Sequence, residues 1–205
     1  CVGDYLDEQP VGDLPPLWTP PSPNMPTVQT AVLYPGLCLL EATTLSEGRG
    51  TTRPFEVVGA PDFDARAFAE AIEAATEGEL FARPLLFEPT FQKHARAVCG
   101  GVVLEVAQRR RLRSVRAGVA IIAAAMATGS DAFGWRSEAY EFVTDRPAFD
   151  LLMGGPAARH ALRDGAGVDA ACAGFAEAAA LLRQRTQGLL LYDRQGGALA
   201  AQGRS

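Results

Sequence analysis

The sequence has 205 residues, of which 48% are apolar and 21% are charged, and its formal net charge at pH 7 is −5. The apolar content is high enough for a sizeable core, which excludes a globally disordered chain. The acidic balance argues against a surface that binds nucleic acid, so we expect no nucleic-acid partner. The sequence has no apolar run long enough to span a membrane, and we expect no membrane insertion.

The two ends of the chain differ in composition from its body. Residues 1–26 are acidic and then rich in proline, which breaks helices, so we expect a lead-in segment anchored by Trp18. The chain begins at Cys1 rather than Met, so we expect it to be a processed or truncated piece. The tail from 193 to 205 is expected to fray. This leaves residues 27–192 as the body of one domain.

The body opens with strand and helix patterns in turn. Residues 27–45 are rich in Val, Leu, Thr and Tyr, which predicts two strands with a turn at Tyr34-Pro35-Gly36. Residues 54–61 predict a short strand. Asp64 suits the N-cap of a helix over 65–75, because the apolar residues that follow it recur three to four positions apart.

The second half of the body becomes helical. Residues 80–91 and 99–107 predict strands, Ser114 suits the cap of a helix over 115–127, and 133–142 reads as an aromatic loop. Three helices at 148–153, 157–163 and 170–187 and a strand at 188–192 complete the predicted elements. Strands and helices mix without strict alternation, which predicts an α+β fold with a mixed or antiparallel sheet covered by helices.

The segment 41–56, EATTLSEGRGTTRPFE, carries the densest group of candidate functional residues. Hydrolysis of a glycosidic bond usually needs two carboxyl groups, one as proton donor and one as base or nucleophile. Glu41 and Glu47 share parity, so an extended backbone would direct both side chains to one face. The alternative is that both are surface glutamates beside a loop.

Two arginines in the same segment are candidates for binding an anion. Gly48 and Gly50 flank Arg49, which allows positive φ or a close approach of the backbone. The planar fork of arginine suits a carboxylate, so Arg49 and Arg53 could clamp an anionic group of a substrate. The alternative is internal pairing with the glutamates of the same segment.

Three further sets of residues have chemical interpretations. Tyr140 and Glu141 could form a platform for a sugar ring, or Tyr140 could belong to a core aromatic cluster. His94 and Cys99 could act as base and thiol nucleophile, although most such pairs are incidental. The cysteines show no spacing typical of a metal site, so we expect free thiols and no metal.

Four blocks in fixed order connect these residues: SPNMPT, YPGLCLLEATTLSEGRGTTRPFEVVGAP, FEPTFQKHARAVCGGV and YEFVTDRPAFDLL. Over about residues 15–192 the chain resembles the C-terminal half of the NamZ-type exo-β-N-acetylmuramidases. This bacterial peptidoglycan-recycling family was long known as a domain of unknown function. The SEGRGT block is the most specific part of the resemblance.

The resemblance implies a two-domain glycoside hydrolase with its cleft between the domains. This chain would be the C-terminal domain, and the Rossmann-like N-terminal domain, which is absent here, would be its partner. The enzyme would remove N-acetylmuramic acid from the non-reducing end of peptidoglycan fragments, without a cofactor. A bacterial periplasmic or secreted location is implied, with the cytoplasm as an alternative. The alternative function is a non-catalytic peptidoglycan-sugar binding or scaffolding module, inactive without its N-terminal half.

The resemblance also assigns roles to residues. Glu47 is the first candidate for the acid/base or orienting carboxylate and Glu41 the second, while Arg49 or Arg53 would bind the lactyl carboxylate of N-acetylmuramic acid. The candidate substrate-binding residues are Arg49, Arg53, Ser46, Asn24, Tyr140, Glu141 and His94.

Overall fold

The computed structural model describes residues 18–190, 192–193 and 197–198. The chain divides into two units. One unit comprises residues 20–172, and the other contains the described residues from 173 onward together with 18–19. The expected lead-in segment lies outside the described residues up to position 17, and residues 18–26 contain no helix or strand. Most of the expected tail also lies outside them.

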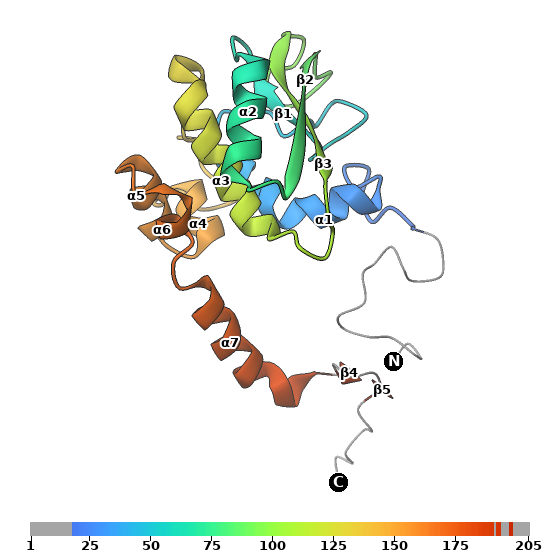
Figure 1. The fold of residues 1–205 in the computed structure, drawn as a ribbon, viewed down its shortest axis with the longest axis vertical. Coiled ribbons are helices and arrows are strands. Elements are labelled where there is room, and N and C mark those ends of the chain that lie inside the picture. Colours follow the sequence, from blue (N-terminus) through green and yellow to red (C-terminus); the bar gives the residue numbers. More distant parts are fainter. Residues whose placement is uncertain (1–17, 191, 194–196, 199–205) are drawn as a thin grey trace. The chain divides into compact units, whose positions relative to one another are not determined.

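The larger unit contains an antiparallel sheet of three strands in the order β1-β3-β2 (Figure 1). The strands are β1 (Val57–Ala60), β2 (Leu80–Phe87) and β3 (Cys99–Val106). The central strand β3 pairs Val103 with Val57 on one side and Cys99 with Phe87 on the other. All three strands were predicted from the sequence at these positions, and the α+β fold with an antiparallel sheet is confirmed.

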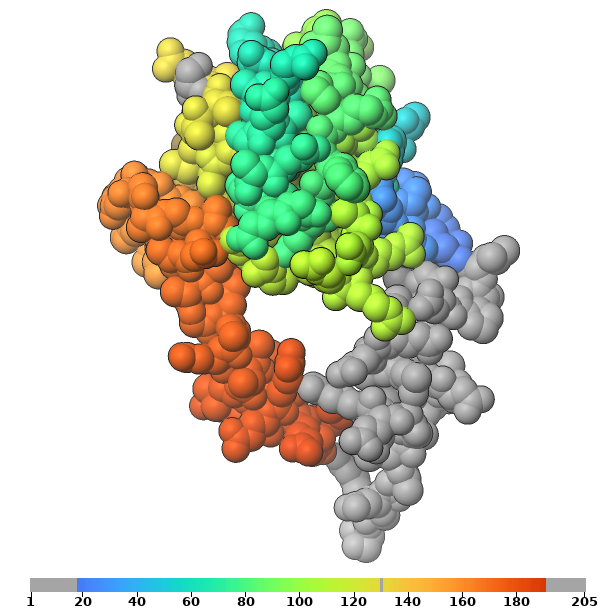
Figure 2. Space-filling view, viewed as in Figure 1, coloured from blue at the N-terminus to red at the C-terminus, as the bar shows by residue number. Residues whose placement is uncertain are grey.

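Helix α2 (Ala65–Ala75) begins where the sequence predicts. Asp64 Oδ1 accepts hydrogen bonds from the backbone N of Arg66 at 2.9 Å and of Ala67 at 3.1 Å, which satisfies two of the free N–H groups at the start of the helix. Phe68 and Ile72 are fully buried on its inner face. The helix packs against β2 and β3 and lies beside β2 on the face seen in Figure 2.

The prediction of two strands over residues 27–45 is wrong. The segment forms helix α1 (Val28–Leu37) and the 3₁₀ helix η2 (Cys38–Ala42). Thr27 caps α1 by accepting from Thr30 N at 3.0 Å, and Pro35 lies within the helix. β-Branched and aromatic residues favour strands only weakly, and packing against the core overrides that preference.

That packing is close between α1 and helix α3 (Ser114–Thr128). A Cβ on Gly36 would lie 1.8 Å from the carbonyl oxygen of Ser114, so only glycine fits at the crossing. The expected role of Ser114 as the cap of α3 is wrong, because it is the first residue of the helix. Its hydroxyl instead accepts from Gly36 N and donates to Leu33 O, both at 3.0 Å, which joins the two helices.

After the short 3₁₀ helix η3 (Ser130–Ala132), the aromatic loop leads into α4 (Ala148–Met153) and α5 (Ala157–Arg163) as predicted. The single helix predicted over 170–187 is instead two helices, α6 (Gly167–Ala171) and α7 (Phe175–Thr186). Gly174 lies between them with φ +81°, a left-handed conformation that interrupts the helical backbone.

The smaller unit contains α7 and the short elements that follow it. Residues 188 and 189, predicted as strand, belong to the 3₁₀ helix η4 (Gln187–Leu189). Among the described residues that follow, β4 (Tyr192–Asp193) pairs with β5 (Gly197–Ala198). No helix among the described residues is long and apolar enough to cross a membrane.

Candidate functional site

The glutamate-rich segment folds as a turn fixed against β1. Ser46 N donates to Gly59 O at 2.8 Å, and Gly59 N donates back to Ser46 O at 3.2 Å. The Ser46 hydroxyl accepts from Gly48 N at 3.2 Å. Ser46 was predicted to bind substrate, but it is only 2% exposed, and its backbone and hydroxyl form the hydrogen bonds that fix the turn.

Gly48 and Gly50 both have positive φ, as the sequence indicated, and both approach other backbone closely. A Cβ on Gly50 would lie 2.6 Å from the carbonyl oxygen of Phe91. The carbonyl of Gly50 also accepts from Thr90 N at 2.9 Å and from the Thr90 hydroxyl at 2.8 Å. The close approach of Gly50 is therefore to the protein's own loop at residues 88–98, and that of Gly48 is to the backbone of Arg53 and Val57.

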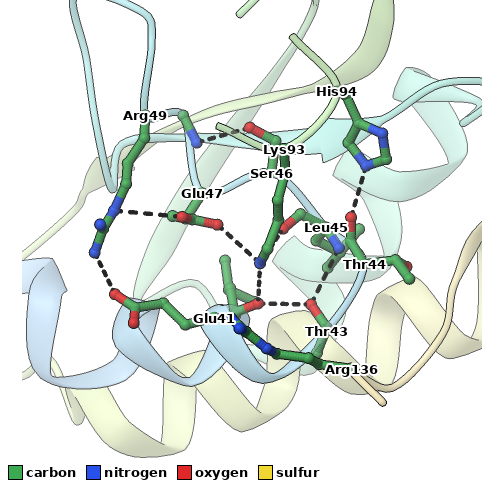
Figure 3. A network of polar contacts seen from close by, with 12 residues as sticks. Glu41, Thr43, Thr44, Leu45, Ser46, Glu47, Arg49, Lys93, His94 and Arg136 are labelled. Carbon is green, nitrogen blue, oxygen red and sulfur yellow. Dashed lines mark hydrogen bonds and ion pairs between the residues drawn. The ribbon is translucent and has the colours of Figure 1, made fainter. Parts of the chain in front are cut away.

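Both candidate carboxylates converge on one guanidinium (Figure 3). Arg49 Nη2 lies 2.5 Å from Glu41 Oε1, and Arg49 Nε lies 3.3 Å from Glu47 Oε1. Glu41 belongs to the 3₁₀ helix η2, so the backbone between Glu41 and Glu47 is not extended. The turn at 46–50 brings the two carboxylates together, and their shared parity plays no part. The alternative of internal pairing is what the structure shows for Arg49.

Lys93 completes this network and was missing from the predicted site. Its ammonium donates to Glu47 Oε2 at 3.0 Å, to Leu40 O at 2.9 Å and to Leu45 O at 3.0 Å (Figure 3). All three ammonium hydrogens thus have acceptors. Burial lowers the pKa of Lys93, and the carboxylate of Glu47 opposes that shift. One signal could have revealed it: Lys93 is the single lysine among 19 basic residues.

The loop that carries Lys93 is held in an uncommon backbone conformation. Gln92, His94 and Arg96 have φ of 68°, 56° and 64°, in the left-handed region that non-glycine residues rarely occupy. Such residues cost about 1–3 kcal/mol each and persist where surrounding contacts fix them. Here the contacts are those of Lys93 and of His94, whose Nε2 donates to Thr44 O at 2.6 Å.

Tyr140 joins the network from the aromatic loop. Its hydroxyl donates to Glu41 Oε2 at 3.1 Å, and its ring packs against the hydrophobic core. Burial and the neighbouring Glu41 carboxylate raise the pKa of Tyr140 to about 12. Glu141 is exposed with φ 54°, in a tight turn closed by backbone hydrogen bonds between Tyr140 and Val143. The structure therefore places Tyr140, but not Glu141, in the network.

Arg53 belongs to a second cluster, centred on Glu56. Arg53 Nη2 lies 2.8 Å from Glu56 Oε2, and the hydroxyls of Thr27 and Thr30 donate to Glu56 Oε1 at 2.6 Å. Within the described part of the chain, Asn24 has one hydrogen bond, from its backbone N to the Ser22 hydroxyl. Roles for Arg53 and Asn24 in substrate binding stay predictions.

A pocket of about 390 Å³ borders Lys93 and His94. Backbone pairing builds one edge of it, because Thr44 N donates to Gly134 O and Arg136 N donates to Ala42 O, both at 2.8 Å. Its lining combines the glutamate segment, the strained loop and the aromatic loop: Thr43, Thr44, Lys93, His94, Trp135, Arg136, Ser137 and Glu138.

The structure gives no support to a thiol nucleophile. Cys99 is fully buried in β3, and burial raises the pKa of its thiol, which disfavours the reactive thiolate. His94 is engaged with Thr44 instead. In the part of the chain that the structure describes, Cys38, Cys99 and Cys172 are free, and no group of three or more His, Cys, Asp or Glu residues could hold a metal ion.

Comparison with known proteins decides the family. A family model described as the C-terminal part of exo-beta-N-acetylmuramidase NamZ matches residues 32–192. The chain belongs to the NamZ C-terminal family. This confirms the resemblance read from the four sequence blocks.

Among relatives of this NamZ domain, the peptidoglycan beta-N-acetylmuramidase NamZ of Bacillus subtilis (strain 168) is 37% identical over 149 residues. That match covers 73% of this chain and 34% of the relative, so the chain spans about a third of the relative's length.

Two crystal structures of DUF1343 family proteins from Bacteroides fragilis share the fold. One superposes with a TM-score of 0.68 at 20% identity and covers 86% of this chain and 45% of that one. The other has a TM-score of 0.59 at 26% identity and covers 85% and 44%.

Proposed function

We propose that this domain supplies one wall of an interdomain site that removes N-acetylmuramic acid from the non-reducing end of peptidoglycan fragments. The observation that carries the proposal is the convergence of Glu41 and Glu47 on Arg49, beside an open pocket and within a chain of the NamZ family. The Bacillus subtilis relative is named a peptidoglycan beta-N-acetylmuramidase, which supports the choice of substrate. Because that substrate is cell-wall material, we also propose a periplasmic or secreted location.

The two carboxylates receive different roles in this proposal. The Glu47 side chain is 4% exposed and lies between the cations of Arg49 and Lys93, which suits a fixed carboxylate that orients other groups. The Glu41 side chain is 18% exposed and is held by Arg49 and the Tyr140 hydroxyl, so it is the one that a sugar can approach. The remaining catalytic group would come from the Rossmann-like half expected to face this wall.

In the same proposal the arginines and the turn residues support the wall. Arg49 holds Glu41 and Glu47 in place, Ser46 shapes the turn, and Arg53 anchors the segment to Glu56. These contacts would keep the carboxylates within reach of a substrate, which matters because small displacements of catalytic groups reduce rates strongly.

The test uses a chromogenic muramide with this chain alone, with the Rossmann-like half added, and with the intact two-domain enzyme. Turnover that requires both halves supports the proposal. In the intact enzyme, Glu41→Gln should lower kcat more than tenfold, about 1.4 kcal/mol of barrier. Glu70→Gln, which removes one exposed carboxylate on α2, is the matched control. A smaller loss for Glu41→Gln removes it from the chemistry.

The alternative of a non-catalytic sugar-binding module rests on one observation. The pocket lining contains a single carboxylate, that of exposed Glu138, whereas a glycosidase of two carboxyl groups needs a pair at the sugar. Binding of muramide without turnover, with both halves present, would favour this module over the enzyme.

A further inference from the structure

Three arginines lie in and around the candidate site, and they differ in how far carboxylates neutralise them. Arg49 contacts two carboxylates at 2.5 and 3.3 Å, and Arg53 contacts Glu56 at 2.8 Å. Arg136 has a weaker partner, because its Nε lies 4.0 Å from the carboxylate of Glu138, whose side chain is 75% exposed. Such an exposed, distant pair contributes little, so Arg136 keeps most of its capacity to bind an anion.

The guanidinium of Arg136 is nevertheless held in position. Its Nη2 donates to Ala139 O at 2.9 Å, and its central carbon lies 5.7 Å from the centre of the Tyr140 ring. Its Nε is buried without a hydrogen-bond acceptor among the described residues. A cation that is fixed in orientation and lacks a close counter-ion loses little entropy when it binds a carboxylate, which favours binding.

The other side chains of the pocket suit the same kind of ligand. His94 uses Nε2 to donate to Thr44 O, so Nδ1 of the neutral ring is an acceptor, which suits a hydroxyl of the sugar rather than its carboxylate. Lys93 adds positive charge next to the pocket, although Glu47 balances it. Trp135 packs on Phe133 and Phe149 and gives the pocket an apolar wall. A volume of about 390 Å³ is within the range of small-ligand sites.

We propose that this pocket, with Arg136 as its main contact, binds the lactyl carboxylate of N-acetylmuramic acid and so distinguishes muramyl from glucosaminyl ends. The inference rests on the proposed function for the class of sugar, and it moves carboxylate recognition from Arg49 and Arg53 to Arg136. N-acetylglucosamine lacks the lactyl ether, so it gains nothing from this cation. Arginine and carboxylate can form two parallel hydrogen bonds, which gives direction as well as attraction.

The test is an NMR titration of this chain with the methyl β-glycosides of N-acetylmuramic acid and N-acetylglucosamine, read at the indole N–H of Trp135. Arg136→Gln should weaken binding of the muramyl glycoside about tenfold and leave binding of the glucosaminyl glycoside unchanged. Glu138→Gln removes the carboxylate that competes for Arg136, so it should strengthen binding of the muramyl glycoside about threefold. Arg163→Gln on α5 is the matched loss of one exposed charge and should change neither.

The proposal is overturned if Arg136→Gln weakens binding of both glycosides equally or of neither. It is also overturned if the muramyl glycoside causes no saturable shift at the Trp135 indole N–H. These outcomes differ from a failure of the proposed function. That function fails if the intact enzyme does not hydrolyse muramides, whereas the titration measures the preference of this pocket for the carboxylate without any turnover.

Discussion

The ammonium of Lys93 lies 3.0 Å from the carboxylate of Glu47, a side chain that is 4% exposed. These residues are 46 positions apart in the sequence, and their contact ties the strained loop at 88–98 to the glutamate segment. Removing one partner of such a buried pair leaves an uncompensated charge, which costs more than the intact pair contributes to stability. The geometry of the site therefore depends on the pair.

Replacing Lys93 by Met should lower the free energy of unfolding by about 3 kcal/mol, because Glu47 and two backbone carbonyls lose their donor. Urea unfolding of the chain and the variant measures this. Arg83→Met on the exposed edge of β2 is the control and should change stability by less than about 0.5 kcal/mol. Equal effects of the two substitutions would show that the contacts of Lys93 do not stabilise the fold.

Glu56 should make stability depend on pH in the acid range. Burial raises the pKa of Glu56, but hydrogen bonds from Thr27, Thr30 and Arg53 outweigh that effect and leave the pKa below its usual 4.5. A pKa depressed by folding contributes stability above the unfolded pKa, and this contribution is lost as the pH falls through the folded pKa.

Glu56→Gln should therefore cost about 2 kcal/mol at pH 7, and the difference from the parent chain should shrink below about pH 4.5 as the parent carboxyl is protonated. Unfolding free energies at three pH values from neutral to acid test this. Glu70→Gln, exposed on α2, should show no such trend. A gap that stays constant with pH would contradict the prediction.

Elements with a strong local signal were predictable from the sequence. Helix α2 has an Asp64 cap and apolar residues at helical spacing, and both features act within a few residues. Helix α1 has a Thr27 cap but no apolar spacing that singles out a helix, because its Val, Leu and Tyr residues suit a strand locally. Its conformation follows from the crossing of Gly36 with α3, a contact between residues far apart in the chain.

The same distinction applies to the candidate site. The segment 41–56 could be singled out by its composition and by the family resemblance. Of the two alternatives that its glycines allowed, positive φ and a close approach to a ligand, the structure shows positive φ. Lys93 and Arg136 could not be placed by spacing, because loops between distant elements bring Lys93 to Glu47 and Arg136 to Ala42. For Lys93 the remaining signals are its place in the block FEPTFQKHARAVCGGV of the family resemblance and its rarity in a chain that otherwise uses arginine.

Gly50 offers a test of how tightly the two loops meet. Gly50→Ala introduces a Cβ that would lie 2.6 Å from Phe91 O, and it also forces a side chain into φ +84°. Gly78 has φ +74°, and a Cβ added there would have no other atom within 4 Å, so Gly78→Ala carries the conformational cost alone, about 1 kcal/mol. Gly50→Ala should cost about 3 kcal/mol, measured by urea unfolding. Equal costs at the two glycines would mean that the loops separate easily.

Tyr140 should titrate far above an ordinary tyrosine, because burial and the Glu41 carboxylate raise its pKa to about 12. Ultraviolet absorbance against pH should show this late titration, and Tyr140→Phe should remove it. Glu41→Gln should lower the pKa without returning it to 10.0, since burial remains. Tyr34→Phe is the control, because it should leave the titration near 12 in place. A Tyr140 pKa that Glu41→Gln does not change would mean that Glu41 is not charged beside the phenol, and its proposed place at the sugar would then need another explanation.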